Sequence, residues 1–121
     1  LGEAAIINNI GLIYNQLGQY PQALEFYQKA LEIRREINDR TGMGTTLHNI
    51  GYLYDRQQQY NQALDFYQQA LIVRREVSDR AGEAISLNNI GLVYNQQGKH
   101  SQALESLERA LAIFRELGDR A

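Results

Sequence analysis

One short segment of the chain occurs three times at a constant spacing of forty residues. It consists of asparagine, isoleucine and glycine in succession, then a tyrosine three residues later, at 9–14, 49–54 and 89–94. A repeat of this period is typical of a solenoid, in which each unit leaves an apolar face that only its neighbour buries. The sequence therefore predicts one domain, 1–121, built from units 1–40, 41–80 and 81–120. Such proteins usually bind rather than catalyse.

Each unit carries two stripes of apolar residues at helical spacing. In the first unit they consist of Ile6, Ile7, Ile10, Ile13, Tyr14 and Leu17, and of Ala23, Leu24, Tyr27, Ala30, Leu31 and Ile37. Residues at i, i+3, i+4 and i+7 lie on one side of a helix and are typical of an amphipathic helix. We therefore expect an all-α fold of six helices, with one helical hairpin per unit and the stripes in the core.

Residues between the two stripes of a unit favour helix ends. Gly18 can adopt the left-handed conformation that closes a helix, and Pro21 suits the first turn of the next helix. Asn61 and Ser101 stand at the position of Pro21 in the later units. Because both residue types accept hydrogen bonds from free amides, we expect them to cap the helices that follow.

An aspartate stands between consecutive units, and its copies are Asp39, Asp79 and Asp119. Each carboxylate can accept hydrogen bonds from the first amides of the next helix and oppose the positive end of the helix dipole. Acid–base catalysis is the alternative role, but neither a histidine nor a second carboxylate recurs beside these aspartates. We therefore predict helix caps, no catalytic residue and no enzyme activity.

Composition and charge exclude several classes of function. Twelve basic and fourteen acidic residues leave a net charge of −2 without a basic stripe, so we expect no nucleic-acid partner. Cysteine is absent, which excludes thiol catalysis and suits a reducing compartment such as the cytoplasm. His48 and His100 occupy different repeat positions, so we predict neither a metal nor another cofactor. No apolar run is long enough to cross a membrane.

The recurring residues of the first unit resemble the signature of the tetratricopeptide repeat, and they are Ile7, Ile10, Gly11, Tyr14, Ala23, Tyr27 and Ala30. The resemblance covers the whole chain, and the forty-residue form is similar to the arrays of kinesin light chains and Pins-type polarity adaptors. It implies a right-handed superhelix in which Gly11 and Ala23 let the two helices of a hairpin approach closely. Arg35 replaces the proline that usually ends the second helix, so we expect this helix to run on.

The resemblance also implies that the side of each first helix opposite the core stripe lines a concave groove. This side is rich in amides and would bind an extended peptide segment of a partner protein. Its residues are Asn8, Asn9, Leu12, Asn15 and Gln16 in the first unit, Thr45, His48, Asn49, Tyr52, Asp55 and Arg56 in the second, and Ile85, Asn88, Asn89, Leu92, Asn95 and Gln96 in the third.

Asn9, Asn49 and Asn89 form a predicted ladder on this side. A side-chain amide offers both a donor and an acceptor and can pair with the backbone of an extended peptide. The same asparagines can instead brace neighbouring helices, and the two roles are compatible. The residues three positions further on, among them Tyr52, are contact residues for a ligand or packing residues between adjacent helices.

Charged residues refine the kind of partner. Family members of the chaperone-adaptor type hold a C-terminal carboxylate with pairs of lysines and arginines, and on this side only His48 and Arg56 resemble such a pair. We therefore expect an internal or extended segment of modest charge, with an acidic residue near Arg56. The runs at 34–36 and 74–76 are interpreted as solvated helix faces or ion pairs between units, or else as a site for an acidic partner.

The last unit keeps an apolar surface where a terminal repeat normally has a polar one. The residues concerned are Leu104, Leu107, Leu111, Ile113 and Leu117. We expect the chain to be a piece of a longer array and to associate with itself, end to end or by swapping, through the last helix. The leading functional prediction is a protein-binding scaffold, and the alternatives are a structural spacer or self-assembly module and a sensory domain for a signalling peptide.

Overall fold

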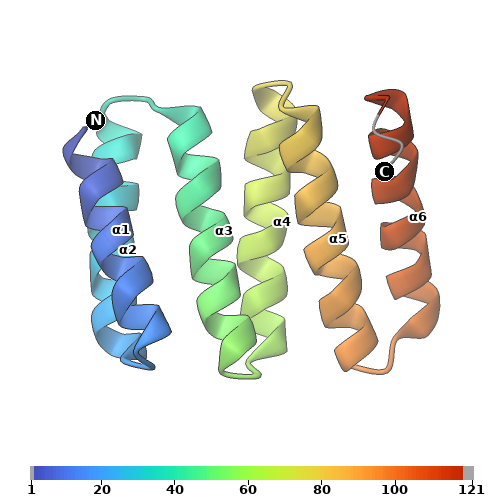
Figure 1. Cartoon of the computed structure of the whole chain (residues 1–121), viewed down its shortest axis with the longest axis horizontal. Helices are drawn as coiled ribbons and strands as arrows, with labels where there is room; N and C mark the ends of the chain where they lie inside the picture. Colours follow the sequence, from blue (N-terminus) through green and yellow to red (C-terminus); the bar gives the residue numbers. More distant parts are fainter. Residues whose placement is uncertain (1, 119–121) are drawn as a thin grey trace.

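The computed structural model describes residues 2–118, which form six helices joined by short turns (Figure 1). The helices are α1 (Glu3–Gln16), α2 (Tyr20–Glu36), α3 (Arg40–Arg56), α4 (Tyr60–Glu76), α5 (Arg80–Gln96) and α6 (His100–Glu116). Consecutive helices run antiparallel and pack on each other, and the three hairpins follow one another along the long axis of the molecule. The predicted all-α solenoid of three helical hairpins is confirmed.

A residue with left-handed backbone stands two positions after the end of the first helix of each hairpin. Gly18, Gln58 and Gly98 have φ angles of 75°, 61° and 77°. The amide of Gly18 donates to the carbonyl of Asn15 at 3.0 Å, and the next amide donates to the carbonyl of Tyr14 at 2.9 Å. This pair of bonds satisfies carbonyls that a helix end otherwise leaves free. The predicted role of Gly18 is confirmed.

Aspartates cap the two helices that begin a later repeat. Asp39 accepts a hydrogen bond from the amide of Gly42 at 2.9 Å, and Asp79 accepts one from the amide of Gly82 at the same distance. The predicted caps at Asp39 and Asp79 are therefore confirmed. Asp119 lies outside the described residues.

The predicted caps at Asn61 and Ser101 are wrong. Helix α4 begins at Tyr60 with Gln59 at the N-cap, so Asn61 already belongs to the first turn, and α6 is one residue early in the same way. Pro21 likewise lies in the first turn of α2, as predicted. The Asn61 side chain instead accepts a hydrogen bond at 3.0 Å from Gln97, the residue that follows α5, so it links two repeats.

Glycine allows the two helices of each hairpin to pack closely. A Cβ atom at Gly11 would lie 2.8 Å from the ring of Tyr27, and one at Gly51 would lie 2.6 Å from the ring of Tyr67. Distances this short exclude any larger residue unless the rings move, and both rings are buried. Helix α2 continues through Arg35 as expected.

The core stripe predicted for α1 is largely at the surface. Ile6, Ile10, Ile13 and Leu17 are exposed, and so is Ile37 at the end of α2. Ile10 is 38% exposed, whereas its equivalents Ile50 and Ile90 are 1% and 4% exposed. The later copies are covered because α2 packs on α3 and α4 packs on α5. Among the described residues, no helix covers the same face of α1.

Candidate peptide-binding face

The residues predicted to bind a peptide lie on α1, α3 and α5, which are the first helices of the three hairpins. We call the side of these helices that carries them the A face. Equivalent residues are forty positions apart and occur at the same level of successive helices, so that Leu12, Tyr52 and Leu92 follow one another across the A face. The fold therefore repeats the same chemical environment three times.

Large apolar side chains stand exposed on the A face. Tyr52 is 42% exposed and Leu92 is 48% exposed, while Leu12 is half-buried. Ile85 is also exposed, two turns before Leu92 on α5. The guanidinium of Arg56 lies 5.8 Å from the centre of the Tyr52 ring, a distance at which a cation is attracted to an aromatic face.

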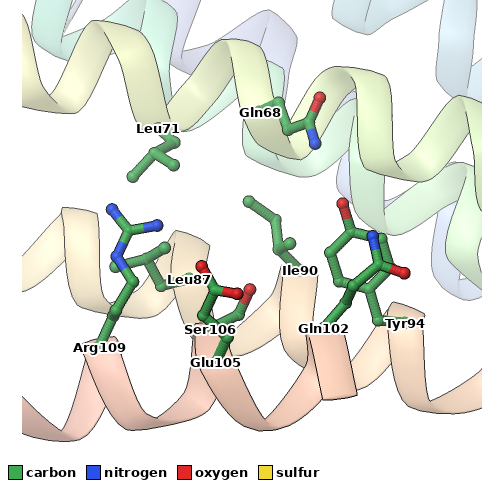
Figure 2. A pocket seen from close by; sticks show the side chains of 9 residues that line it. All are labelled: Gln68, Leu71, Leu87, Ile90, Tyr94, Gln102, Glu105, Ser106 and Arg109. Carbon is green, nitrogen blue, oxygen red and sulfur yellow. The ribbon is translucent and has the colours of Figure 1, made fainter. Parts of the chain in front are cut away.

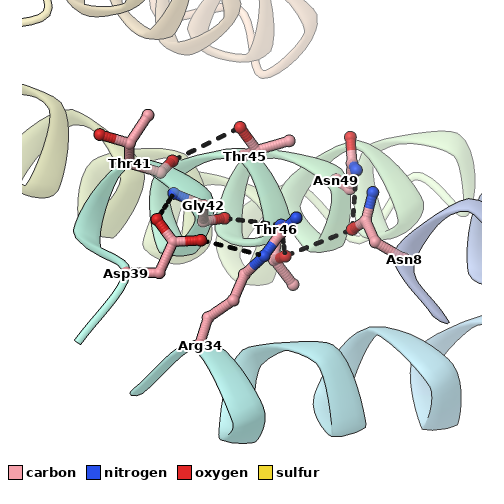
Figure 3. Close-up of polar contacts among 8 residues, drawn as sticks. All are labelled: Asn8, Arg34, Asp39, Thr41, Gly42, Thr45, Thr46 and Asn49. Atoms are coloured by element: carbon pink, nitrogen blue, oxygen red, sulfur yellow. Dashed lines mark hydrogen bonds and ion pairs between the residues drawn. The ribbon is translucent and has the colours of Figure 1, made fainter. Parts of the chain in front are cut away.

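Two asparagines of the predicted ladder brace neighbouring helices. Nδ2 of Asn49 donates to Oδ1 of Asn8 at 3.2 Å, which joins α3 to α1 (Figure 3). Nδ2 of Asn89 lies 3.3 Å from Nδ1 of His48, which joins α5 to α3. Bracing is therefore a role of both residues, and each amide retains a second hydrogen for a further partner.

Arg34 connects the first two repeats beneath this brace. It is buried, and its Nη1 donates to Oγ1 of Thr46 at 2.7 Å and to the carbonyl of Gly42 at 2.9 Å (Figure 3). The Thr46 hydroxyl in turn donates to Oδ1 of Asn8 at 3.3 Å. Three helices thus share one polar network, and the prediction of a solvated face does not hold for Arg34.

The second junction between repeats uses the same device with different residues. Nη1 of Arg74 donates to Oγ of Ser86 at 3.0 Å and to the carbonyl of Gly82 at 3.3 Å. Arg75 in α4 also forms an ion pair, at 3.0 Å, with the buried Glu83 in α5. Ion pairing between units is therefore confirmed for the second run of charged residues.

His48 is a half-buried ionisable group of the A face. Burial and, to a smaller extent, the positive charge of Arg74 together lower the pKa of its imidazole to about 4. The ring packs against Tyr67, with 5.7 Å between ring centres. His48 is therefore neutral at pH 7, so that its ring nitrogen can accept the hydrogen bond from Asn89.

Two predicted residues are enclosed within the fold. Asn8 lies inside the network at the first junction, and Asn15 is fully buried beside Tyr27. Neither the Asn15 amide nor the Tyr27 hydroxyl makes a hydrogen bond of good geometry within residues 2–118. One repeat later, the hydroxyl of Tyr67 donates to Asp55 at 3.3 Å. Burial raises the pKa of the Asp55 carboxyl, and the bond from Tyr67 opposes that rise.

The remaining predicted residues of the A face are exposed, and they are Asn9, Gln16, Thr45, Asn88, Asn95 and Gln96. The Asn95 side chain also lies 3.0 Å from the ring of His100, across the turn between α5 and α6. A ligand contact at these positions stays a prediction.

Sequence reasoning missed the polar pairs at the junctions. The signal was present, because Thr46 and Ser86 interrupt a stripe that is apolar at Ile6 in the first repeat. A small hydroxyl in an otherwise apolar stripe indicates a buried hydrogen-bonding partner. In both cases that partner is the arginine twelve residues earlier.

The structure also limits the chemistry that the described part of the chain can support. Within residues 2–118, no three histidine or carboxylate side chains gather as ligands for a metal ion. None of the helices described there is long and apolar enough to span a membrane.

Comparisons with known proteins agree with the fold and the repeat. A sequence model described as Tetratricopeptide repeat matches the chain over residues 2–76 and again over 43–116. No curated protein matches the chain. Tetratricopeptide repeats are protein-interaction scaffolds and are generally not catalytic.

Several solved structures share the fold. BtubC (BKLC) from P. vanneervenii has a TM-score of 0.88 and 25% identity, over 98% of this chain and 49% of its own. Aspartyl phosphate phosphatase F from Bacillus subtilis has a TM-score of 0.90 and 21% identity, over 96% of this chain and 30% of its own. The TPR domain of Arabidopsis FLU has a TM-score of 0.85 and 18% identity, over 94% of this chain and 96% of its own.

This chain therefore spans about half the length of BtubC and less of the phosphatase. Because the two family matches together run from residue 2 to residue 116, the chain belongs to the tetratricopeptide repeat family.

Proposed function

We propose that the chain is a scaffold that binds an extended peptide segment of a partner protein along the A face. The observation that carries the proposal is the exposure of Tyr52 and Leu92 at equivalent positions of α3 and α5, within a face that is rich in polar side chains. Large apolar side chains that stay exposed and recur beside polar groups are typical of contact residues. Both lie away from the first and last helices.

The chemistry around these residues suits an extended backbone. Asn49 and Asn89 lie three residues before Tyr52 and Leu92, one turn away along each helix. A partner strand that runs across α3 and α5 meets, on each helix, one amide for its backbone and one apolar surface for a side chain. Successive helices offer the same pair, which favours an extended segment over a compact ligand.

The charges of the A face limit the kinds of peptide that can bind there. His48 carries no charge at neutral pH because burial lowers its pKa to about 4. Arg56 is exposed and stacks on Tyr52, so that it provides a cation next to the apolar contact. We infer that the bound peptide segment places an aromatic or aliphatic side chain in contact with Tyr52 and an acidic side chain beside Arg56.

The scaffold acts by recognition alone, without a catalytic step, in the cytoplasm. The lack of cysteine suits a reducing compartment such as the cytoplasm. A sensory domain that receives a signalling peptide would use the same face, so that function is a special case of the proposed peptide-binding scaffold.

The test compares peptide capture by matched variants. A library of short peptides is screened with the wild-type chain, and the affinity of each selected peptide is then measured with Y52A/L92A and with I72A. Ile72 is 56% exposed but lies on α4, so its variant controls for the general loss of an exposed apolar side chain. We expect Y52A/L92A to weaken binding by about tenfold or more and I72A to have no effect.

A second arm tests the amides. N9A removes an exposed asparagine of the ladder without breaking a brace of the kind that Asn49 and Asn89 make. We expect N9A to weaken capture while its melting temperature stays at the wild-type value. Equal affinity of the wild type and Y52A/L92A for every selected peptide would refute the proposal.

We also propose, as a second function, that copies of the chain assemble end to end. Two apolar faces carry this proposal: Ile10 and its neighbours on α1, and Leu111, 47% exposed, with Leu104 on α6. Their internal equivalents pack on each other at both junctions, where Ile50 and Leu71 are buried. The end of one copy thus has the apolar pattern that the start of another requires.

One pair of residues that differs between the internal junctions and the outer faces supports a second copy of the chain as the partner of each outer face. At the internal junctions, Arg34 bonds to Thr46 and Arg74 bonds to Ser86. At the two outer faces the equivalent positions are Phe114 and Ile6, so that both members of the polar pair are replaced by apolar residues. A junction between copies therefore sets Phe114 against Ile6 and leaves no arginine without its hydroxyl partner.

A further inference from the structure

A cavity of about 200 Å³ lies between α4 and α6, with α5 as its floor (Figure 2). Its lining residues are Gln68 and Leu71 of α4, Leu87, Ile90 and Tyr94 of α5, and Gln102, Glu105, Ser106 and Arg109 of α6. Leu87 and Ile90 face the neighbouring helices, whereas Ile85 and Leu92 on the same helix are exposed. The cavity therefore opens on the side of the molecule opposite the A face.

The equivalent groove between α2 and α4 is also hollow, with a volume of about 350 Å³, but the third repeat differs from the first two in one residue of this lining. Phe26 stacks on Tyr14 with 5.4 Å between ring centres and 13° between ring planes. One repeat later, Phe66 stacks on Tyr54 with 5.6 Å and 15°. The third repeat keeps the tyrosine as Tyr94 but has Ser106 in place of the phenylalanine.

The first two repeats thus each fill this position with a phenyl ring, and the third leaves one face of Tyr94 without its ring. The equivalent groove between α2 and α4 has the Phe66 ring in its wall, together with Leu31 and Ile50. Leu71 and Ile90 are the corresponding apolar walls of the cavity between α4 and α6. The walls that receive a phenyl ring are therefore retained where the ring itself is missing.

The rim of the cavity supplies a cation for an aromatic guest. In the first repeat, Nζ of Lys29 lies 5.4 Å from the centre of the Phe26 ring. Arg109 occupies the position of Lys29 in the third repeat, and its side chain lines the cavity (Figure 2). A guest ring on Tyr94 thus has an aromatic face on one side and a guanidinium within reach on the other.

We propose that this cavity binds a phenylalanine side chain of a partner protein. The guest takes the position that Phe26 and Phe66 take in the earlier repeats and supplies in trans the ring that the third repeat lacks. The site is separate from the A face, so that a scaffold of this kind holds two segments on opposite sides. Phenylalanine is favoured over an aliphatic residue because Tyr94 and Arg109 both attract an aromatic ring.

The probe for this site is N-acetyl-phenylalanine amide, with N-acetyl-leucine amide as the aliphatic control. Both are titrated into the isotope-labelled chain, and the methyl resonances of Leu71, Leu87 and Ile90 are followed by NMR. We expect the phenylalanine probe to shift these resonances in a saturable manner and the leucine probe to bind several-fold more weakly. The methyl resonances of Leu12 and Leu92 on the A face should not move.

Three variants test the geometry. S106F restores the internal ring, and we expect it to abolish the shifts and raise the melting temperature. F66S removes the equivalent ring from the second repeat. We expect it to uncover the face of Tyr54 beside the existing groove, so that the phenylalanine probe shifts the resonances of Leu31 and Ile50 more than it does in the wild type. R109Q introduces the residue found at this position in the second repeat, and we expect it to weaken the phenylalanine probe by about two- to fivefold.

The possible outcomes separate clearly. Equal binding of the phenylalanine and leucine probes overturns the proposal, and so do unchanged shifts in a folded S106F. If S106F loses its helical circular dichroism, R109Q decides, because it leaves Tyr94 and Ser106 unchanged and alters only the cation at the rim. Unchanged affinity of R109Q in that case also overturns the proposal.

Discussion

At the scale of single residues, the imidazole of His48 links the packing of α3 to pH. Its pKa in the folded chain is about 4, whereas a free histidine titrates near 6.5. The unfolded chain therefore binds a proton at this residue more readily than the folded chain does between these two values. The free energy of unfolding is unaffected by His48 above pH 6.5, and it falls as the pH drops from 6.5 towards 4.

We predict that H48N removes this part of the pH dependence. Asparagine stands at the equivalent positions Asn8 and Asn88, so the variant has a residue that the repeat already accepts and that can still bond to Asn89. Between pH 7 and pH 5, the wild type should lose about 1 to 2 kcal/mol more stability than H48N. Urea denaturation at the two pH values measures the difference.

The carboxylates titrate in both proteins, so their effect cancels in this comparison. Parallel loss of stability in the wild type and in H48N would show that His48 is protonated in the folded chain without cost. The prediction for His48 would then be wrong.

A helical wheel groups residues by the side of the helix on which they lie, but it does not give the depth of each side chain. Asn8 and Asn9 are neighbours in the sequence and both read as groove residues, yet Asn8 is enclosed and Asn9 is exposed. The difference arises because Thr46 of α3 bonds to Asn8 and is itself bonded to Arg34 of α2. Partners so distant in the sequence are invisible to a helical wheel.

At the scale of helices, the glycine in the middle of each first helix sets how closely a hairpin packs. A Cβ atom at Gly51 would lie 2.6 Å from Cδ1 and 2.8 Å from Cε1 of Tyr67. The ring is 1% exposed and has no room to move, so the two helices must separate. We predict that G51A lowers the free energy of unfolding by about 1 to 3 kcal/mol, measured by chemical denaturation.

Gly44 on the same helix provides the control. A Cβ atom there would come no closer than 3.3 Å, to the side chain of Arg74, and alanine favours helix over glycine. We expect G44A to remain within about 1 kcal/mol of the wild type. Equal losses in both variants would mean that the helix itself, and not its contact with Tyr67, is sensitive to the substitution.

Helix types and their order were predictable from the sequence because the apolar stripes and left-handed turn residues are local signals. Exact helix starts were less so. Asn61 has the residue type of a cap, but α4 begins one residue earlier. The N-cap of α4 is Gln59, whose backbone conformation is close to that of Gln19, the N-cap of α2. Turn geometry fixed by the preceding helix end thus overrides the capping preference of the residue type.

At the scale of the whole molecule, periodicity predicts the neighbours of a repeat but not whether each neighbour is there. Ile10, Ile50 and Ile90 stand at the same position of the repeat. Their exposure differs because α2 packs on α3 and α4 packs on α5, whereas no described helix packs on the same face of α1. In the sequence, the A face and the outer faces of α1 and α6 are likewise made of repeated positions, and the repeat alone does not distinguish them. Their different surroundings emerge only from the assembled row of hairpins.

We predict that the 121-residue chain associates head to tail and that two complementary variants reveal it. L111E charges the face of α6 and leaves α1 intact, while I10E does the opposite, and both side chains are exposed, so each variant should fold. Contacts of this heterologous kind let one copy join the next through unlike faces. Sedimentation velocity should show larger species of the wild type as concentration rises, and only monomers of either variant.

An equal mixture of the two variants is the decisive sample. One intact α6 face and one intact α1 face remain in it, so the expected product is a dimer with one copy of each variant and no larger species. Contact between two like faces predicts the opposite, since the mixture would then contain only dimers of identical chains. A wild type that stays monomeric at every concentration excludes both arrangements, and the apolar faces of α1 and α6 would then need a partner other than this chain.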